Sequence, residues 1–173
     1  MPSSRILIAS QVLGSAASSV TFSSIPGTYT DLCLKVSART TGAAVLDNIG
    51  IQFNSSTSSI YSDTTLRGAG AGGADSVRDS NYTAVLFYNS MSSGGSTAST
   101  FGNAEIYIPS YTASQNKPLG GFGVSETNAT TAYMSAGAFL WRNTAAITSI
   151  AITSDNAQSF VSGSSFYLYG LSA

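Results

Sequence analysis

The chain has 173 residues, a net charge of −1 and only 7 basic and 8 acidic side chains, with no histidine and one cysteine. Serine (32 residues) and threonine (18 residues) are abundant, while most side chains that enzymes use near neutral pH are scarce, so we expect a structural or binding protein without enzymatic activity, catalytic residue, metal or cofactor. The lysines and arginines form no cluster, and no apolar run approaches the roughly 20 residues that span a membrane, which argues against nucleic-acid and membrane partners.

Alternation of apolar and polar side chains with a period of two runs through most of the chain, and it predicts about ten short β-strands. In residues 32–38, for example, Leu32, Leu34 and Val36 share one face, while Lys35 shares the other face with its polar neighbours. In chain order the strands are expected at residues 6–8, 19–22, 32–38, 49–53, 84–88, 104–108, 121–125, 132–141, 147–153 and 166–170.

One face of each strand is expected to lie in a hydrophobic core, because successive side chains of a strand point to opposite sides of its sheet. Hydrophobic residues make up 43% of the chain, which is enough for a core in a single domain of residues 1–173. The residues expected in this core are Leu32, Leu34, Val36, Ile49, Ile51, Phe53, Ile106, Ile108, Ile150, Ile152, Phe166 and Leu168.

Turn-forming residues separate the expected strands, as in residues 24–27 (SIPG), 93–95 (SGG) and 155–156 (DN). Many short strands with regular turns are typical of antiparallel sandwiches and jelly rolls. We therefore predict an all-β fold, a single antiparallel β-sandwich of jelly-roll type, with helix in at most about a tenth of the residues.

Two segments interrupt the strand pattern and are expected to be loops. Residues 68–74 (GAGAGGA) have no side chains to pack and run into a polar stretch that ends at Ser80, and residues 90–100 are rich in serine and glycine. Long loops on a rigid β scaffold often carry binding residues, although an ordinary solvated loop explains the same composition. Because a flexible loop can order on docking, we take 68–80 as a candidate contact with a partner, through Gly68, Gly70, Gly72, Gly73, Asp75, Arg78 and Asp79.

The eight acidic residues form no recognisable catalytic or metal-binding motif. A glycosidase needs two carboxylates about 5–10 Å apart, and a calcium loop needs several oxygen ligands in series. Asp75 and Asp79 flank the glycine-rich segment without such a series. The single cysteine, Cys33, cannot form an intrachain disulfide, and its place in an alternating strand favours a small packed side chain over a reactive thiol.

The start of the sequence has one feature of a signal peptide, since Arg5 precedes a short apolar run. That run is too short and is broken by Ser10 and Gln11, so we expect no signal peptide and synthesis in a reducing cytoplasm.

Tyrosines are expected at strand ends or on strand faces opposite the apolar ones, at Tyr29, Tyr61, Tyr88, Tyr107, Tyr111, Tyr167 and Tyr169. Tyrosine is favoured where one end of a side chain is dry and the other wet, as in subunit interfaces and sugar-binding platforms. Tyrosine is also simply a good strand former. Of these two possible functions of the tyrosines, we rank a subunit interface above a ligand-binding platform.

Several segments, taken in order, resemble a family of small virion proteins of tailed bacteriophages. They span nearly the whole chain, and they are 7–13 (LIASQVL), 18–32 (SSVTFSSIPGTYTDL), 51–54 (IQFN), 61–62 (YS), 104–111 (AEIYIPSY), Trp141 with 146–150 (AITSI), and 160–170 (FVSGSSFYLYG). The resemblance implies a component of the virus particle, which is a capsid decoration protein, a head fibre or a tail-associated protein. It supplies no catalytic residues.

The leading hypothesis is a capsid decoration (cement) protein that binds the major capsid protein on the outside of the virion, with 68–80 as its candidate capsid contact. We expect a homo-oligomer, a trimer, because Lys35, Arg39, Glu105 and Lys117 are nearly all the charges that could blunt free strand edges. The alternative is a module of a tail or head fibre that binds a receptor or a host surface glycan. Glycan binding predicts exposed aromatic rings with nearby Asn, Asp or Gln in one concave site, whereas decoration predicts a broad flat face.

Overall fold

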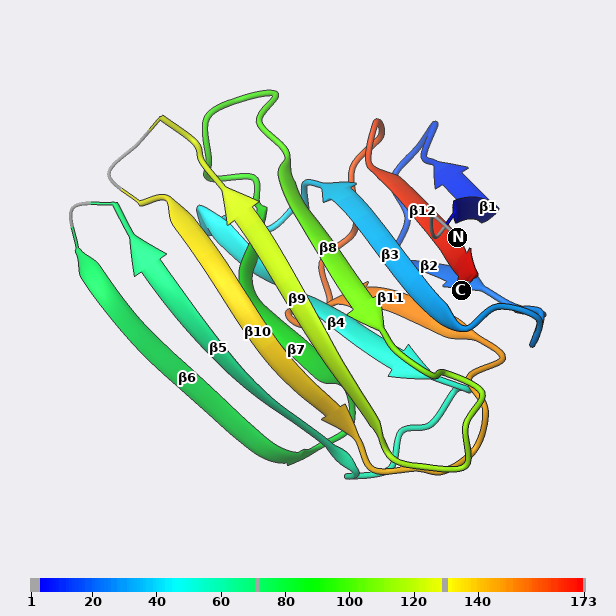
Figure 1. Ribbon diagram of the computed structural model, residues 1–173. Coiled ribbons are helices and arrows are strands. Elements are labelled where there is room, and N and C mark those ends of the chain that lie inside the picture. Colours follow the sequence, from blue (N-terminus) through cyan, green and yellow to red (C-terminus); the bar gives the residue numbers. More distant parts are fainter. Residues whose placement is uncertain (1–3, 71, 129–130, 173) are drawn as a thin grey trace.

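The computed structural model describes residues 4–70, 72–128 and 131–172, and these residues form twelve β-strands and no helix (Figure 1). The all-β prediction is therefore confirmed. In chain order the strands are β1 (Ser4–Val12), β2 (Ser19–Phe22), β3 (Asp31–Ala38), β4 (Leu46–Phe53), β5 (Tyr61–Ala69), β6 (Gly73–Tyr82), β7 (Val85–Ser92), β8 (Gly102–Ile108), β9 (Lys117–Ser125), β10 (Tyr133–Trp141), β11 (Ile150–Ser154) and β12 (Ser165–Ser172).

The strands form two antiparallel sheets that pack face to face, and in Figure 1 the smaller sheet lies behind the larger. The larger sheet has eight strands in the order β1-β12-β3-β8-β9-β10-β5-β6, and the smaller has four in the order β2-β11-β4-β7. Each of the ten predicted segments overlaps one strand, whereas β5 and β6 were not predicted. We call β9, β10, β5 and β6 the extension, and the other eight strands the body.

Hydrophobic side chains from both sheets fill the space between them. All twelve residues predicted for the core are at most 2% exposed, so that prediction is confirmed. Aromatic rings add to this core: Phe160 packs edge-on against Phe166 with centroids 5.0 Å apart, and Phe53 packs against Trp141 at 5.4 Å. Burial of such rings is the main favourable term in the stability of the fold.

The extension is covered mainly by one strand of the smaller sheet, β7, which contacts β9, β10 and β5, while Phe53 of β4 covers Trp141 at the end of β10. Its inner face uses glycine to let aromatic rings approach the backbone. A Cβ atom at Gly121 would lie 2.9 Å from the ring of Phe139 and 3.2 Å from that of Phe87, and one at Gly123 would lie 3.1 Å from Phe87. Phe87 and Phe139 themselves pack edge-on at 5.2 Å, so one layer of rings joins the extension to β7.

Two of the tyrosines expected outside the apolar faces lie instead in the core. Tyr61 and Tyr111 are fully buried, because each ring packs in the core while its hydroxyl reaches a backbone partner. The Tyr61 hydroxyl donates to the carbonyl of Ser56 at 3.1 Å, and the Tyr111 hydroxyl donates to the carbonyl of Pro26. A buried tyrosine needs such a partner for its hydroxyl group.

The charges that were expected to blunt strand edges lie elsewhere. Lys35 and Glu105 are on central strands, and Lys117 is fully buried, with its ammonium group donating to the carbonyl of Ala113 at 2.7 Å. The edge strands of the larger sheet carry other charges instead, namely Arg5 on β1 and Asp75, Arg78 and Asp79 on β6. A shortage of edge charges therefore remains only in the smaller sheet, whose edge strands β2 and β7 carry none.

Candidate functional site

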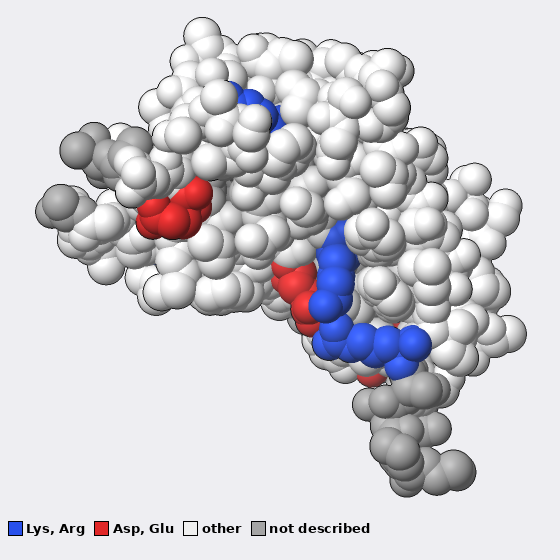
Figure 2. Space-filling view, turned by 90° about the horizontal axis from the view of Figure 1, so that it is seen from above, with Lys and Arg blue, Asp and Glu red and all other residues white. Residues whose placement is uncertain are grey.

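The outer face of the eight-stranded sheet, which is turned away from the smaller sheet, carries a cluster of opposite charges. The Nη2 atom of Arg5 lies 3.0 Å from Oε1 of Glu105, and Nζ of Lys35 lies 2.9 Å from Oε2 of the same carboxylate. Figure 2 shows basic and acidic side chains that adjoin each other beside a hollow in the molecular surface. Two of the three ion pairs among the described residues thus share one carboxylate on this face.

Sheet register brings residues that are far apart in the chain into one row. Tyr167, Lys35, Glu105 and Phe122 stand opposite one another across β12, β3, β8 and β9. Residues directly opposite in antiparallel strands point to the same face, so all four side chains lie on the outer side. Tyr169 lies two residues along β12 from Tyr167, and it shares that face.

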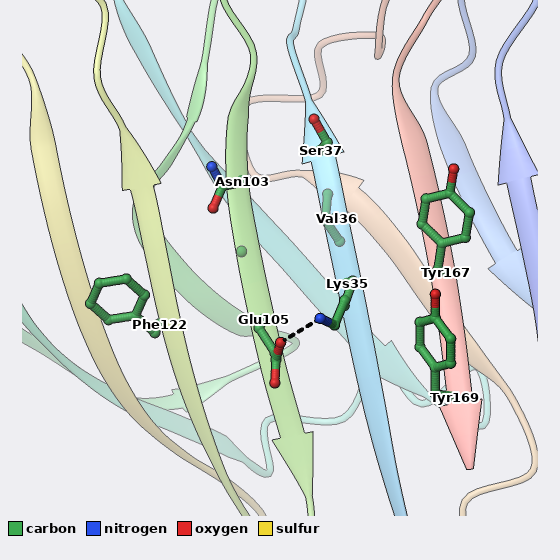
Figure 3. Close-up of a pocket in the computed structure, with 9 residues that line it drawn as sticks. Lys35, Val36, Ser37, Asn103, Glu105, Phe122, Tyr167 and Tyr169 are labelled. Atoms are coloured by element: carbon green, nitrogen blue, oxygen red, sulfur yellow. Dashed lines mark ion pairs between the residues drawn. The ribbon is translucent and has the colours of Figure 1, made fainter. Parts of the chain in front are cut away.

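A groove of about 460 Å³ lies over this row, a size typical of ligand sites, which span about 300–1,000 Å³. In Figure 3 the Lys35–Glu105 ion pair lies at its centre, with Tyr167 and Tyr169 on one side and Phe122 on the other. The broad faces of these three rings are turned toward the viewer, who looks onto the outer face of the sheet. The groove is lined by Lys35, Val36, Ser37, Asn103, Ala104, Glu105, Phe122, Tyr167 and Tyr169.

The ion cluster keeps Glu105 charged while leaving all three side chains open to solvent. Hydrogen bonds from Arg5 and then from Lys35 lower the pKa of Glu105 to about 2. The side chains of Arg5, Lys35 and Glu105 are 45%, 43% and 41% exposed. Lys35 and Glu105 line the groove, and Arg5 lies beside it through its ion pair with Glu105.

Cys33 lies on β3 two residues from Lys35 and is fully buried. Burial, followed by the negative charge of Glu105, raises the pKa of the Cys33 thiol to about 11. A thiol with such a pKa stays protonated and is a poor nucleophile. The interpretation of Cys33 as a small packed residue agrees with this burial.

Asp31, the aspartate nearest the groove, accepts hydrogen bonds from two other residues. The hydroxyl of Tyr107 donates to Oδ2 of Asp31 at 2.6 Å, and the backbone amide of Ser110 donates to Oδ1 at 2.8 Å. The same hydrogen bond raises the pKa of Tyr107. Asp31 therefore holds the end of β8 in place and does not line the groove.

The segment predicted as a flexible loop, residues 68–80, is instead most of a β-hairpin. Gly68 lies opposite Ala74 on β6, one pair before the last, which joins Ala69 to Gly73, and Gly70 and Gly72 lie in the turn. Gly73 adopts φ +87°, a conformation that favours glycine, where β6 begins. The loop prediction was wrong because glycine and alanine have no alternation to reveal a strand.

The three charged residues of that segment have different surroundings and different partners. Arg78 lies on the outer face of β6, opposite Thr64. Asp75 forms an ion pair with Arg67, and Asp79 accepts a hydrogen bond from the hydroxyl of Tyr88. The structure therefore gathers these residues on one edge strand, and of the three only Arg78 lines a pocket, a small one of about 200 Å³.

The second expected loop, residues 90–100, is partly strand and partly a well-held turn. Residues up to Ser92 belong to β7. Beyond them the guanidinium of Arg39 donates to Oγ of Ser96 at 2.7 Å and to the carbonyls of Gly94 and Thr97 at 3.1 and 2.9 Å. Arg39 thus fixes this turn, which is not a freely solvated loop.

Acidic residues do not assemble into a metal site within the described ranges, since no group of three or more His, Cys, Asp or Glu lies together there. Asp63 and Asp79 stand opposite each other on β5 and β6. Burial, with a smaller effect of the Asp79 charge, raises the pKa of Asp63 to about 7. Asp63 is only 3% exposed, so a substrate cannot reach it.

Within the described ranges, no helix is long and apolar enough to cross a membrane.

No family model, curated protein or solved structure matches this chain. What the groove can bind must therefore be argued from its own residues. None of those residues belongs to the segment that the sequence singled out as a contact.

Proposed function

We propose that this protein is a non-enzymatic component of a tailed-phage particle that binds a host surface glycan through the groove on its outer sheet face. The observation that supports this most strongly is the arrangement of Tyr167, Tyr169 and Phe122 around Lys35 and Glu105. A concave site with accessible aromatic rings and polar side chains is what glycan binding requires. Phe122 is exposed and Tyr167 and Tyr169 are partly exposed, and Asn103 adds an amide to the same lining.

A sugar matches the chemistry of the groove, because a pyranose ring has both an apolar face and hydroxyl groups. An aromatic ring with a free face can stack on that apolar face, while charged and amide groups bind the hydroxyls. The residues of the groove stand on paired strands of a large sheet, and such a rigid support limits the entropy lost on binding.

The place in a virus particle is supported by the sequence resemblance and by the chemistry of the chain. A protein of the virion surface must be compact and chemically inert, and the only thiol of the chain is buried. The proposed setting is the outside of the virion after synthesis in the host cytoplasm, with no nucleic-acid or membrane partner.

The proposed fold is a jelly roll with two inserted hairpins. When β5, β6, β9 and β10 are left out and the other strands are renumbered 1 to 8 in chain order, the sheets read 1-8-3-6 and 2-7-4-5. This order, with eight strands in two four-stranded sheets, supports the jelly-roll assignment.

The experiment is binding of the purified protein to an array of bacterial surface polysaccharides and defined oligosaccharides. We expect selective binding that Tyr169→Ala weakens about tenfold, on the scale of a lost stacking contact. Tyr82→Ala is the matched control, since Tyr82 is 40% exposed on β6 and away from the groove. Absence of any glycan binding, or equal loss in both variants, contradicts the proposal.

Capsid decoration is the second candidate, and a separate observation favours it. Phe122, Leu66 and Met134 are 49%, 58% and 57% exposed on the outer face of the extension. A row of exposed apolar side chains on a sheet suits contact with the major capsid protein or with sister subunits in a trimer.

Co-sedimentation with capsids that lack this protein tests decoration, and sedimentation of the free protein tests the trimer. We expect Leu66→Glu with Met134→Glu to abolish capsid binding, whereas Tyr169→Ala leaves it unchanged. Wild-type protein that does not bind such capsids contradicts decoration without affecting glycan binding.

A further inference from the structure

We propose that the groove selects glycans that carry a carboxylate, and that Arg5 and Lys35 bind this group. The inference rests on the proposed glycan-binding function and adds the chemical class of the sugar, which is a uronic or sialic acid rather than a neutral hexose.

The first argument is the local charge. Two cations, Arg5 and Lys35, face one carboxylate, Glu105, so the cluster carries a net charge of 2 − 1 = +1, whereas the whole chain carries −1. Asp31 on the same face keeps its negative charge, since its donors Tyr107 and Ser110 are neutral, but it lies four residues from Lys35 along β3. A positive site on a slightly negative molecule attracts an anion.

The second argument is the number of hydrogen-bond donors that remain. An arginine has five N–H donors and a lysine has three. Within the described residues, Arg5 and Lys35 have Glu105 as their only side-chain partner. Each cation therefore keeps donors for a second carboxylate, and both side chains are more than two-fifths exposed.

The third argument is the position of the rings relative to the cations. Tyr167 is directly opposite Lys35 on the neighbouring strand, and neighbouring strands lie about 4.8 Å apart. A sugar ring stacked on Tyr167 or Tyr169 thus places a carboxylate on its edge within reach of Lys35. The groove can therefore bind both the apolar face and the charged edge of a single sugar unit.

Glu105 has a defined role in this site. It holds the two cations together and, with its pKa lowered to about 2, remains an anion at any physiological pH. It therefore competes with an acidic ligand for the same donors. Its removal should strengthen the binding of acidic sugars, whereas a purely structural ion cluster predicts no such gain.

The test compares ligands that differ only in the carboxylate. Oligogalacturonate and the galactose oligomer of the same linkage form one pair, glucuronate and glucose oligomers form a second, and sialyllactose and its uncharged methyl ester form a third. Affinity is measured by calorimetry with the full chain at low and physiological salt. We expect the acidic member of at least one pair to bind more tightly, with a preference that shrinks as salt rises.

Three variants then assign the carboxylate site. Lys35→Gln and Arg5→Gln should each weaken acidic binding roughly three- to fivefold, the scale of an exposed charge pair, and leave neutral binding unchanged. Glu105→Gln should strengthen acidic binding by a similar factor. Arg78→Gln is the matched control, because Arg78 is a cation on the same sheet face but on the far edge strand.

The outcomes separate the inference from the function on which it rests. Equal binding of acidic and neutral partners, with loss in Tyr169→Ala, overturns the carboxylate preference and keeps glycan binding. No binding of any probe here or on the polysaccharide array overturns both. Weaker acidic binding in Glu105→Gln, with an unchanged melting temperature, also overturns the inference.

Discussion

The body and the extension bury their strands in different ways, although they share one sheet. In the body, inner positions hold large apolar side chains such as Leu34, Ile106 and Phe166, all fully buried. In the extension, the corresponding row holds Gly121, Gly137 and Thr65. A sheet can thus be covered by a thick aliphatic layer, or by small residues that allow one layer of rings to lie against its backbone.

The difference extends to buried polar groups. Asp47 of the body accepts hydrogen bonds from Thr40 Oγ1, Ser154 Oγ, Asn156 Nδ2 and the amide of Asn48, all within 2.9 Å. By contrast, the four buried side-chain atoms without a hydrogen-bond partner among the described residues all lie on β5 and β10: Asp63 Oδ1, Thr65 Oγ1, Ser135 Oγ and Trp141 Nε1. The extension should therefore be the less stable region, since unsatisfied buried polar groups cost free energy.

Removing one ring from each region tests this difference most strongly. Phe166→Ala and Phe139→Ala should each lower the free energy of unfolding, by at most about 3–5 kcal/mol, because both rings are buried. Hydrogen exchange should then rise throughout the protein in Phe166→Ala, but mainly in β5, β6, β9 and β10 in Phe139→Ala. Uniform exchange in both variants would show that the extension does not open on its own.

Protonation of Asp63 should make the stability depend on pH. Its folded pKa of about 7 lies above the unfolded value near 3.9, so the folded state binds the proton more tightly. Stability is then highest below about pH 4 for this group and falls as pH rises through 7, by up to about 4 kcal/mol. Urea unfolding from pH 4 to 8 measures this, and Asp63→Asn should remove the slope; an equally steep slope in the variant contradicts the assignment.

The two buried aspartates should respond oppositely to the same substitution at pH 8. Asp47→Asn places an amide among hydrogen-bond donors and should cost about 2–3 kcal/mol of unfolding free energy. Asp63→Asn removes a poorly solvated charge whose one backbone donor, the amide of Leu86, lies at 3.3 Å, and should stabilise the fold. Equal destabilisation by both would show that Asp63 is as well satisfied as Asp47.

The smallest effect concerns two buried serines. Ser92 Oγ lies 3.0 Å from Ser125 Oγ, whereas Ser135 Oγ has no partner among the described residues. Ser92→Ala should cost about 1 kcal/mol, and Ser135→Ala should be neutral or stabilising by less than about 1 kcal/mol. Thermal melts of the two variants check the difference in sign.

The sequence pattern predicted the strands of the body much better than the hairpin of β5 and β6 at the edge of the extension. Isoleucine, leucine and phenylalanine at alternate positions reveal β3, β4, β8 and β12 directly. On β5 the inner positions after Tyr61 are Asp63, Thr65 and Arg67, so the buried face is polar and the alternation disappears. The strand forms because its neighbours supply the pairing, which no local pattern contains.

The groove could be predicted only in parts. Alternation had already placed Lys35 on a polar strand face and Tyr167 and Tyr169 opposite an apolar one. It could not show that β12, β3, β8 and β9 are neighbours, because strand order depends on contacts between distant segments. Arg5 had been considered only as the flank of an apolar run, and its ion pair with Glu105 spans 100 residues.

The scarcity and placement of basic residues also bear on resistance to proteases that cut after lysine and arginine. Five of the seven such residues lie within strands, at Arg5, Lys35, Arg67, Arg78 and Lys117. Of the other two, Arg39 is bound to the turn after β7, and Arg142 donates to the carbonyl of Ser59 and to Oδ1 of Asn81. Because a protease needs an extended, mobile segment, trypsin-like enzymes would find no ready cleavage site in the described part of the folded chain.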